Sequence, residues 1–255
     1  MTESRSGFDS LKGELDRDGF VVVRQFLPAD ELATLRENLD RYIRDVVPTV
    51  PESDAFYEDR TRPGTLKQLQ RMDQDRYFAE YQRNRRWTEL AATLLGEPAA
   101  SEQPEWFNKP AGTNHVTPPH QDNFYFCLTP PQVLTIWLAL DTVDAENGCL
   151  RYVVGSHRHG FRPHAKSKIL GFSQGITDYC ADDFTRERAV VLQPGDAVAH
   201  HGMMIHRADA NLSATRQRRS FALVFKGASC QRDQAAYDRY LASARQQHRE
   251  MGVGS

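Results

Sequence analysis

The sequence has few of the features that mark a specialised class of protein. Its four cysteines are widely scattered and include no Cys-x-x-Cys pair, so neither a zinc–thiolate site nor a redox dithiol is indicated, and reduced, buried thiols are expected. No hydrophobic run approaches the roughly 18 residues of a membrane span, and the charged N-terminus lacks the apolar core of a secretory signal. The formal net charge is only −2, which gives no reason to expect a nucleic-acid or anionic membrane partner. These absences favour a cytoplasmic globular protein.

The first hundred residues show mainly helical patterns. After Pro28, apolar residues from Leu32 to Val46 recur at steps of three and four, which predicts a helix that buries one stripe against a sheet. The region 48–63 is rich in proline and charged residues without periodicity, which predicts a loop. The other elements predicted here are helices over 8–17 and 85–95 and strands over 20–23 and 65–69.

From residue 105 the chain changes to short β-like runs separated by turn signals such as Asn147-Gly148 and Pro194-Gly195. This spacing is typical of a β-sandwich or barrel. The predicted strands cover 105–109, 122–128, 133–141, 149–154, 189–192, 197–201 and 219–226, and a final helix covers 233–250. Because no repeat or linker interrupts the chain, we expect one domain over 1–255, with an N-terminal layer over 8–99 and a β core over about 100–227.

A metal site is indicated by His120 and Asp122, which follow a Pro-Pro pair. In a β-strand, residues two apart project to the same side and can bind one ion together. A third ligand must come from elsewhere, and two imidazoles with one carboxylate leave positions open on a metal, as suits non-haem Fe(II) chemistry with dioxygen. A His-x-Asp pair also arises by chance in a chain with nine histidines and 34 acidic residues, so its context must decide.

Nine short motifs, in order along the chain, provide that context. They are Trp106–Pro110, Thr117–Asp122, Trp137–Asp141, Glu146–Leu150, Gly155–His157, Pro194–Asp196, Ile205-His206, Asn211–Ser213 and Arg218-Arg219. Over roughly residues 15–227 the chain thereby resembles the phytanoyl-CoA dioxygenase family of Fe(II)/2-oxoglutarate oxygenases. The resemblance implies a mainly β fold with flanking helices, namely a cupin-like double-stranded β-helix or jelly roll with the iron inside.

The resemblance also implies the metal ligands, which are His120, Asp122 and His206. The family pattern places the distal ligand eleven residues after Gly195, at His206. His200 would share the face of His206 if the strand ran unbroken, although Gly202 can break that register. His201 either lines the pocket or lies in the core.

For the co-substrate, the resemblance implies that Arg218 binds the distal carboxylate of 2-oxoglutarate, because a planar guanidinium can donate two parallel hydrogen bonds. The family interval is often one residue shorter and would fall on Gln217, which indicates an insertion within 212–217. Arg219 is the alternative, and strand alternation allows only one of the two arginines to point inward. Thr117, Trp137 and Lys67 match family positions near the co-substrate.

The implied reaction consumes 2-oxoglutarate and dioxygen at Fe(II), releases succinate and CO2, and hydroxylates an unactivated C–H bond of a small molecule. Because Asp122 is present rather than a small residue, hydroxylation is favoured over halogenation. The locally basic segment 157–168 is either a solvated loop or a feature that attracts an anionic substrate. A hydrolytic metal-dependent cupin and a non-catalytic ligand-binding jelly roll are the alternatives, and no oligomeric state is predicted.

Overall fold

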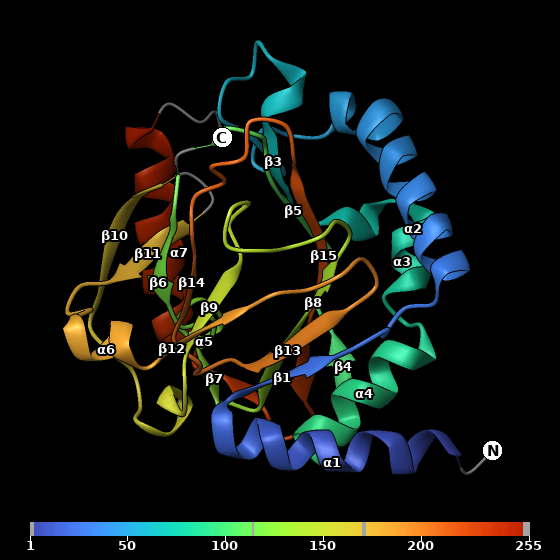
Figure 1. Ribbon diagram of the computed structural model, residues 1–255. Coiled ribbons are helices and arrows are strands. Elements are labelled where there is room, and N and C mark those ends of the chain that lie inside the picture. Colours follow the sequence, from blue (N-terminus) through green and yellow to red (C-terminus); the bar gives the residue numbers. More distant parts are fainter. Residues whose placement is uncertain (1–2, 114, 170–171, 252–255) are drawn as a thin grey trace.

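The computed structural model describes residues 3–113, 115–169 and 172–251, which form two antiparallel sheets with flanking helices (Figure 1). The mainly β class with flanking helices expected from the sequence is therefore confirmed. In order across the main sheet lie β1 (Phe20–Val23), β13 (Ala197–His201), β8 (Val133–Ala139), β15 (Arg218–Gly227), β5 (Glu105–Lys109), β3 (Leu66–Leu69) and β2 (Ala55–Tyr57), and β4 (Ala99–Ser101) also pairs with β15.

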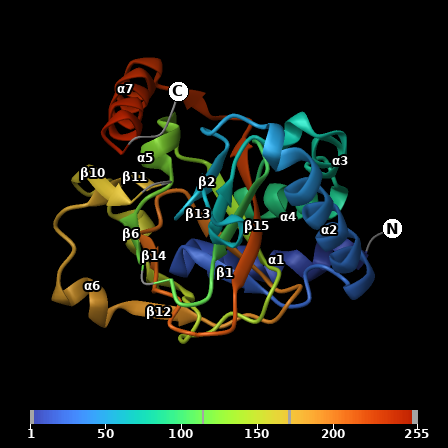
Figure 2. The same ribbon diagram turned by 90° about the horizontal axis from the view of Figure 1, so that it is seen from above.

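A second sheet lies beside the main one (Figures 1 and 2). Residues of both sheets line one cavity. Its order is β12 (Glu187–Val190), β9 (Leu150–Val153), β14 (His206–Ala208) and β6 (Thr117–His120). Two further pairs are β10 (His164–Ile169) with β11 (Phe172–Ile176) and β7 (Leu128–Thr129) with β16 (Gln231–Arg232). Strands that are neighbours in space come from distant parts of the chain, so the cavity is assembled only in the complete fold.

Helices cover the outer face of the main sheet. On this side lie α2 (Ala29–Arg41), α3 (Arg76–Tyr81) and α4 (Arg85–Leu95), with α1 (Glu3–Asp18) along one end of the sheet (Figures 1 and 2). On the opposite side lie α5 (Asn123–Phe126), α6 (Ala181–Thr185) and α7 (Gln234–Glu250). The helix predicted from the stripe that ends at Val46 continues beyond α2 as a π-helical turn over Tyr42–Val46.

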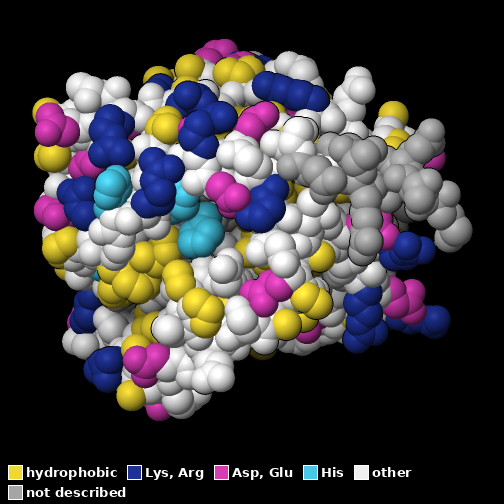
Figure 3. Space-filling model, turned by 90° about the horizontal axis from the view of Figure 1, so that it is seen from below, with side chains coloured by type: hydrophobic (Ala, Val, Ile, Leu, Met, Phe, Trp, Pro, Cys, Tyr) yellow, Lys and Arg dark blue, Asp and Glu magenta, His cyan; other side chains and the backbone are white. Residues whose placement is uncertain are grey.

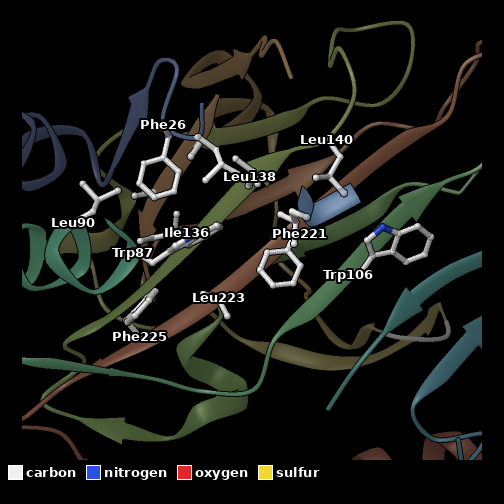
Figure 4. Packing of buried hydrophobic residues seen from close by; sticks show 14 of the residues in the cluster. Phe26, Trp87, Leu90, Trp106, Ile136, Leu138, Leu140, Phe221, Leu223 and Phe225 are labelled. Atoms are coloured by element: carbon white, nitrogen blue, oxygen red, sulfur yellow. The ribbon is translucent and has the colours of Figure 1, made fainter. Parts of the chain in front are cut away.

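Strand alternation divides the central strands into an apolar outer face and a mixed inner face. On β15, Phe221, Leu223 and Phe225 are fully buried and pack outward with residues such as Ile136 of β8 and Trp87 of α4 (Figure 4). The Trp87 and Phe221 rings meet edge to face, with centroids 5.8 Å apart. The alternating apolar residues of these strands thus form one face of the hydrophobic core, as their period of two predicts.

On the inner face, Thr135 and Trp137 of β8 and Arg218 of β15 point into the cavity. A strand that is apolar on one side therefore presents polar side chains on the other. Thr135, Trp137 and Arg218 thus share the inner side of the main sheet.

One predicted strand is wrong. Residues 122–128 were expected to continue extended, but the strand ends at His120, Asp122 has helical backbone angles (φ −58°, ψ −37°), and α5 follows. Asn123 closes the turn by accepting from Leu128 N and donating to its carbonyl, and Cys127 takes a left-handed conformation. The aromatic residues Phe124, Tyr125 and Phe126, which suggested a strand, lie in α5 instead. The local hydrogen bonds that stabilise this helical turn cannot be inferred from the apolar pattern of the sequence.

Other elements were missed or shifted. The predicted loop over 48–63 contains β2, and the helix predicted over 8–17 begins earlier, at Glu3. Part of the basic segment 157–168 belongs to β10, which pairs with β11.

On the face seen from below, basic and acidic side chains are interspersed across the described area (Figure 3). Within the described ranges, no helix combines the length and apolar character needed to cross a bilayer.

Candidate active site

The three candidate metal ligands converge where β6 and β14 lie side by side. His206 stands opposite His120 in the antiparallel register, and Asp122 follows two residues later at the turn into α5. Asp122 Oδ1 lies 3.4 Å from His120 Nε2 and 3.6 Å from His206 Nε2. All three ligand atoms lie within 4.8 Å of one another, and all three side chains are buried. The ligands are thus brought together by strand pairing and a turn, and not by the single extended strand that the sequence suggested.

The second ring nitrogen of each histidine fixes the orientation of its ring. His120 Nδ1 lies 2.8 Å from the carbonyl of Pro118, and His206 Nδ1 lies 3.1 Å from that of Met204. Because a carbonyl can only accept, each Nδ1 must carry the proton, and each Nε2 keeps a free electron pair directed toward Asp122. This is the tautomer required for a metal bound through Nε2.

Asp122 is oriented by two further side chains. Its Oδ2 accepts a 2.6 Å hydrogen bond from Thr135 Oγ1 and lies 3.0 Å from His200 Nε2. His200 is in turn 3.0 Å from the Tyr152 hydroxyl through Nδ1. Oδ1 is left facing the two ligand histidines. His200 therefore supports the carboxylate and is not one of the three converging groups.

Sequence reasoning considered His200 only as a ligand and missed Thr135. Strand alternation could have placed Thr135 on the inner face of β8 beside Trp137, but its partner lies in another element. His201 is not among the described residues that line the cavity, and its ring lies 5.6 Å from that of His157.

The protonation states of the triad suit a divalent metal. Burial by itself would raise the pKa of Asp122, but the surrounding imidazoles outweigh it and hold this pKa well below its ordinary value. Burial and the neighbouring His120 lower the pKa of His206 well below its ordinary value. A carboxylate with two neutral imidazoles is the donor set that non-haem Fe(II) prefers, so the residues present fit that ion.

The triad opens onto a cavity of about 390 Å³ between the two sheets. Arg218, the first residue of β15, points into it and is only 4% exposed. Its guanidinium carbon lies 5.2 Å from the centre of the Trp137 ring, and its Nε has no hydrogen-bond partner among the described residues. Burial lowers the pKa of Arg218 to about 10, so it remains a cation at neutral pH.

Arg219 points the opposite way, as strand alternation requires. It donates through Nη2 to Asp141 at 2.8 Å, on the outer face of the sheet. Gln217 accepts a 3.0 Å hydrogen bond from Asn108. Of the neighbouring candidates, Arg218 is the one that reaches the cavity.

Two lysines line the cavity with Arg218. Lys109 Nζ donates to the carbonyl of His115 at 2.7 Å, and burial together with the charge of Arg218 lowers its pKa well below the ordinary value. Burial also lowers the pKa of Lys67. Thr117, the first residue of β6, lines the same cavity. The sequence predicted Lys67 and Thr117 here but missed Lys109, although alternation along β5 places it on the same face as Phe107.

The basic segment 157–168 is engaged elsewhere. Arg162 pairs with Asp178 at 3.0 Å and Asp183 at 3.2 Å, and Lys166 lies 3.4 Å from Glu250. Among the described residues of this segment, none lines the cavity. The expectation that it attracts an anionic substrate is therefore not supported, because its charges meet acidic partners that are distant in sequence.

Comparison with known proteins agrees with this geometry. The model of the family described as phytanoyl-CoA dioxygenase (PhyH) matches residues 15–220. A probable phytanoyl-CoA dioxygenase of Caenorhabditis elegans is 27% identical over 214 residues, covering 77% of this chain and 68% of that protein. A phytanoyl-CoA dioxygenase of Arabidopsis thaliana is 23% identical, covering 80% of this chain and 83% of that protein.

Among solved structures, EvdO2 from Micromonospora carbonacea var. aurantiaca in complex with 2-oxoglutarate matches with a TM-score of 0.68 and 27% identity, covering 86% of this chain and 90% of that one. The epimerase SnoN in complex with Fe3+, alpha ketoglutarate and nogalamycin RO matches in fold, with a TM-score of 0.71 and 22% identity over 88% of this chain and 85% of that one. The extent of the family match, together with the buried triad, shows that the chain belongs to the phytanoyl-CoA dioxygenase family of Fe(II)- and 2-oxoglutarate-dependent oxygenases.

Proposed function

We propose that this oxygenase hydroxylates an unactivated C–H bond of a small molecule and converts 2-oxoglutarate and dioxygen to succinate and CO2. The observation that carries the proposal is that three ligand atoms within 4.8 Å of one another share a cavity with the buried guanidinium of Arg218. A ligand set beside a carboxylate-binding group is what an iron enzyme with a 2-oxo acid co-substrate requires.

His120, Asp122 and His206 would hold Fe(II), whose contribution when bound is the activation of dioxygen. The chain's own part is to keep Asp122 ionised and His206 neutral, as their surroundings already do. Thr135 and His200 hold the carboxylate in place. The burial of the three side chains limits access of water to the reacting groups.

Arg218 would bind the distal carboxylate of 2-oxoglutarate, since its Nε is buried and available. Trp137 supports the guanidinium through its ring. Thr117 and Lys67 line the same cavity and would contact the co-substrate, and Lys109 adds a further donor. A buried cation without a carboxylate partner is costly, so an anionic co-substrate also relieves the burial of Arg218.

Hydroxylation is preferred over the alternatives. A hydrolytic cupin has no need for a buried carboxylate-binding arginine, and a binding protein without chemistry has no need for a complete ligand set. SnoN is described as an epimerase, and incorporation of label from 18O2 into the product separates hydroxylation from epimerisation.

The proposal is tested by titrating 2-oxoglutarate into the anaerobic Fe(II)-loaded protein and following the visible charge-transfer band of a chelated keto acid. We expect a band in the wild type and none with His206→Ala. Arg218→Gln should require at least about tenfold more 2-oxoglutarate, because a charge-assisted hydrogen bond is worth about 1.5–3 kcal/mol.

The matched control is Arg219→Gln, whose side chain pairs with Asp141 on the outer face and should leave the titration midpoint unchanged. Absence of the band in the wild type, with tight zinc binding instead, would overturn the proposal. An Arg219 effect equal to that of Arg218 would overturn the assignment of the carboxylate site.

A further inference from the structure

A carboxyl group faces the cavity from the main sheet. Glu105 lies on β5 opposite Ala222 of β15, and Ala222 is in turn opposite Trp137 of β8, so Glu105 occupies the central part of the inner face. Its side chain lines the same cavity as the metal triad. The Glu105 side chain is surrounded by protein but keeps some solvent-accessible surface, because one side of it faces the cavity.

Glu105 has no counter-ion in the part of the chain that the structure describes. Among the described residues, no hydrogen bond or ion pair of its carboxyl group is found, and burial together with the negative charge of Asp122 raises its pKa to about 8. Arg71, another charged residue lining the cavity, pairs with Asp54. An unpaired buried carboxylate is costly, so an ionised Glu105 needs a partner that the cavity receives from outside.

The bound co-substrate and metal do not supply that partner. The two positive charges of Fe(II) would be neutralised by Asp122 and one carboxylate of 2-oxoglutarate. The negative charge of the second carboxylate would be neutralised by Arg218. Lys67 and Lys109 line the cavity near Arg218, and the charges of Arg218 and Lys67 both lower the pKa of Lys109. Glu105 would therefore still face the substrate space without a cation.

An aromatic wall stands beside Glu105. Tyr240 of α7 is close enough for the charge of Glu105 to raise its pKa. The Tyr240 ring lies 6.1 Å from Tyr237 and 5.6 Å from Tyr125, which lies 5.7 Å from the ring of His120. The wall therefore runs from α7 to a metal ligand.

The hydroxyl groups of Tyr125 and Tyr240 are engaged by neighbouring protein groups. Tyr125 donates to the carbonyl of Gln174 at 2.8 Å, and Tyr240 accepts from the Ser173 hydroxyl at 3.4 Å. These bonds fix the rings and leave their π surfaces as the groups presented. Aromatic faces next to a carboxylate form an environment that attracts a cationic nitrogen group.

We propose that Glu105, with Tyr125 and Tyr240, forms the substrate subsite for a protonated amine or a comparable cationic nitrogen group. This inference rests on the proposed function and names its substrate class. The cation would be held on the inner face of the main sheet, so that a neighbouring C–H bond faces the triad on the second sheet. It replaces the expectation of an anionic substrate, which depended on the basic segment.

The test compares two small probes of similar shape, n-butylammonium and neutral n-pentanol. Their binding to the full chain loaded with Zn(II) and 2-oxoglutarate is measured by saturation-transfer NMR at pH 9, where Glu105, with its pKa of about 8, is ionised and an alkylammonium still carries its charge. We expect n-butylammonium to bind at least about tenfold more tightly than n-pentanol, and Glu105→Gln to abolish the difference, because the amide keeps the shape but loses the charge. Glu37→Gln, which removes an exposed charge, is the matched control and should behave as wild type.

Tyr240→Leu provides a second variant that keeps Glu105. This variant should weaken the binding of n-butylammonium several-fold and leave the binding of n-pentanol unchanged, because only the cation loses its attraction to the aromatic ring. Equal binding of both probes to the wild type, or a preference retained in Glu105→Gln, would overturn the proposal. Preference for n-pentanol would also overturn it and indicate a hydroxyl-bearing substrate.

These outcomes are distinguishable from failure of the proposed function. Probe binding requires no turnover and can be repeated on the metal-free chain. If the wild type lacks the Fe(II)–2-oxoglutarate band but keeps the Glu105-dependent preference, the oxygenase proposal fails and the cation subsite stands. If the band forms without that preference, only the subsite is lost.

Discussion

At the residue scale, the candidate site depends on hydrogen bonds made by atoms that do not face the metal position. Asp122 presents Oδ1 to the ligand histidines because Thr135 and His200 engage Oδ2. His120 and His206 present Nε2 because backbone carbonyls engage Nδ1. Such supporting contacts orient ligands and raise metal affinity.

We expect Thr135→Val to lower Fe(II) affinity about tenfold, because the isosteric side chain removes the 2.6 Å bond that holds Asp122. Anaerobic calorimetric titration with Fe(II) measures this effect. Thr49→Val, at an exposed hydroxyl that donates to the carbonyl of Val46, is the control. Unchanged affinity in Thr135→Val would mean that this hydrogen bond does not position the ligand.

At the scale of elements, β15 contributes side chains both to the hydrophobic core and to the cavity. One face carries Phe221 and its neighbours into the core beneath the helices, while the other begins with Arg218 in the cavity. The helices on the outer face therefore stabilise the sheet that carries Arg218. Of these helices, α4 has the bounds predicted from the sequence, 85–95, and a side-chain cap at its start.

The cap of α4 gives an element-scale prediction. The Asn84 side chain accepts a 2.9 Å hydrogen bond from Arg86 N, so Asn84→Ala should lower the free energy of unfolding by about 1 kcal/mol. Urea denaturation measures the change. Asn84→Ser, which can still cap, should lose much less, and equal losses in both variants would show that the cap is not the cause.

At the scale of the whole molecule, stability should fall as the pH drops from about 6.5 to 4. Burial and the nearby His157 lower the pKa of His201 to about 4. Between these pH values the unfolded chain binds a proton at His201 that the folded chain does not, so acidification favours unfolding. The full shift corresponds to about 3 kcal/mol at pH 4. Below about pH 4, carboxylates with lowered pKa, such as Asp196 and Asp209, add further losses.

His201→Gln should flatten this dependence. Urea denaturation of the metal-free protein at several pH values measures it, and the difference between wild type and variant isolates His201 from the other histidines. Parallel curves for the two proteins between pH 6.5 and 4 would show that His201 is not responsible.

The sequence by itself determined the class of the fold and named His120, Asp122 and His206 as candidate ligands. Strand alternation required that only one of Arg218 and Arg219 face inward but did not say which. Apolar periodicity is a local property, which is why α4 and strands such as β5 have their predicted bounds. It could not reveal that Asp122 begins a helical turn, because that turn depends on the bonds of Asn123.

Only the tertiary structure decided how the charged and polar groups are partnered. Arg162 is neutralised by two distant aspartates, while Glu105 remains without a partner beside the tyrosines of α7. Thr135 becomes a support for Asp122 only when β8 and the turn after β6 meet. The type of a side chain is written in the sequence, but its pairing and its pKa depend on neighbours that the fold brings from elsewhere in the chain.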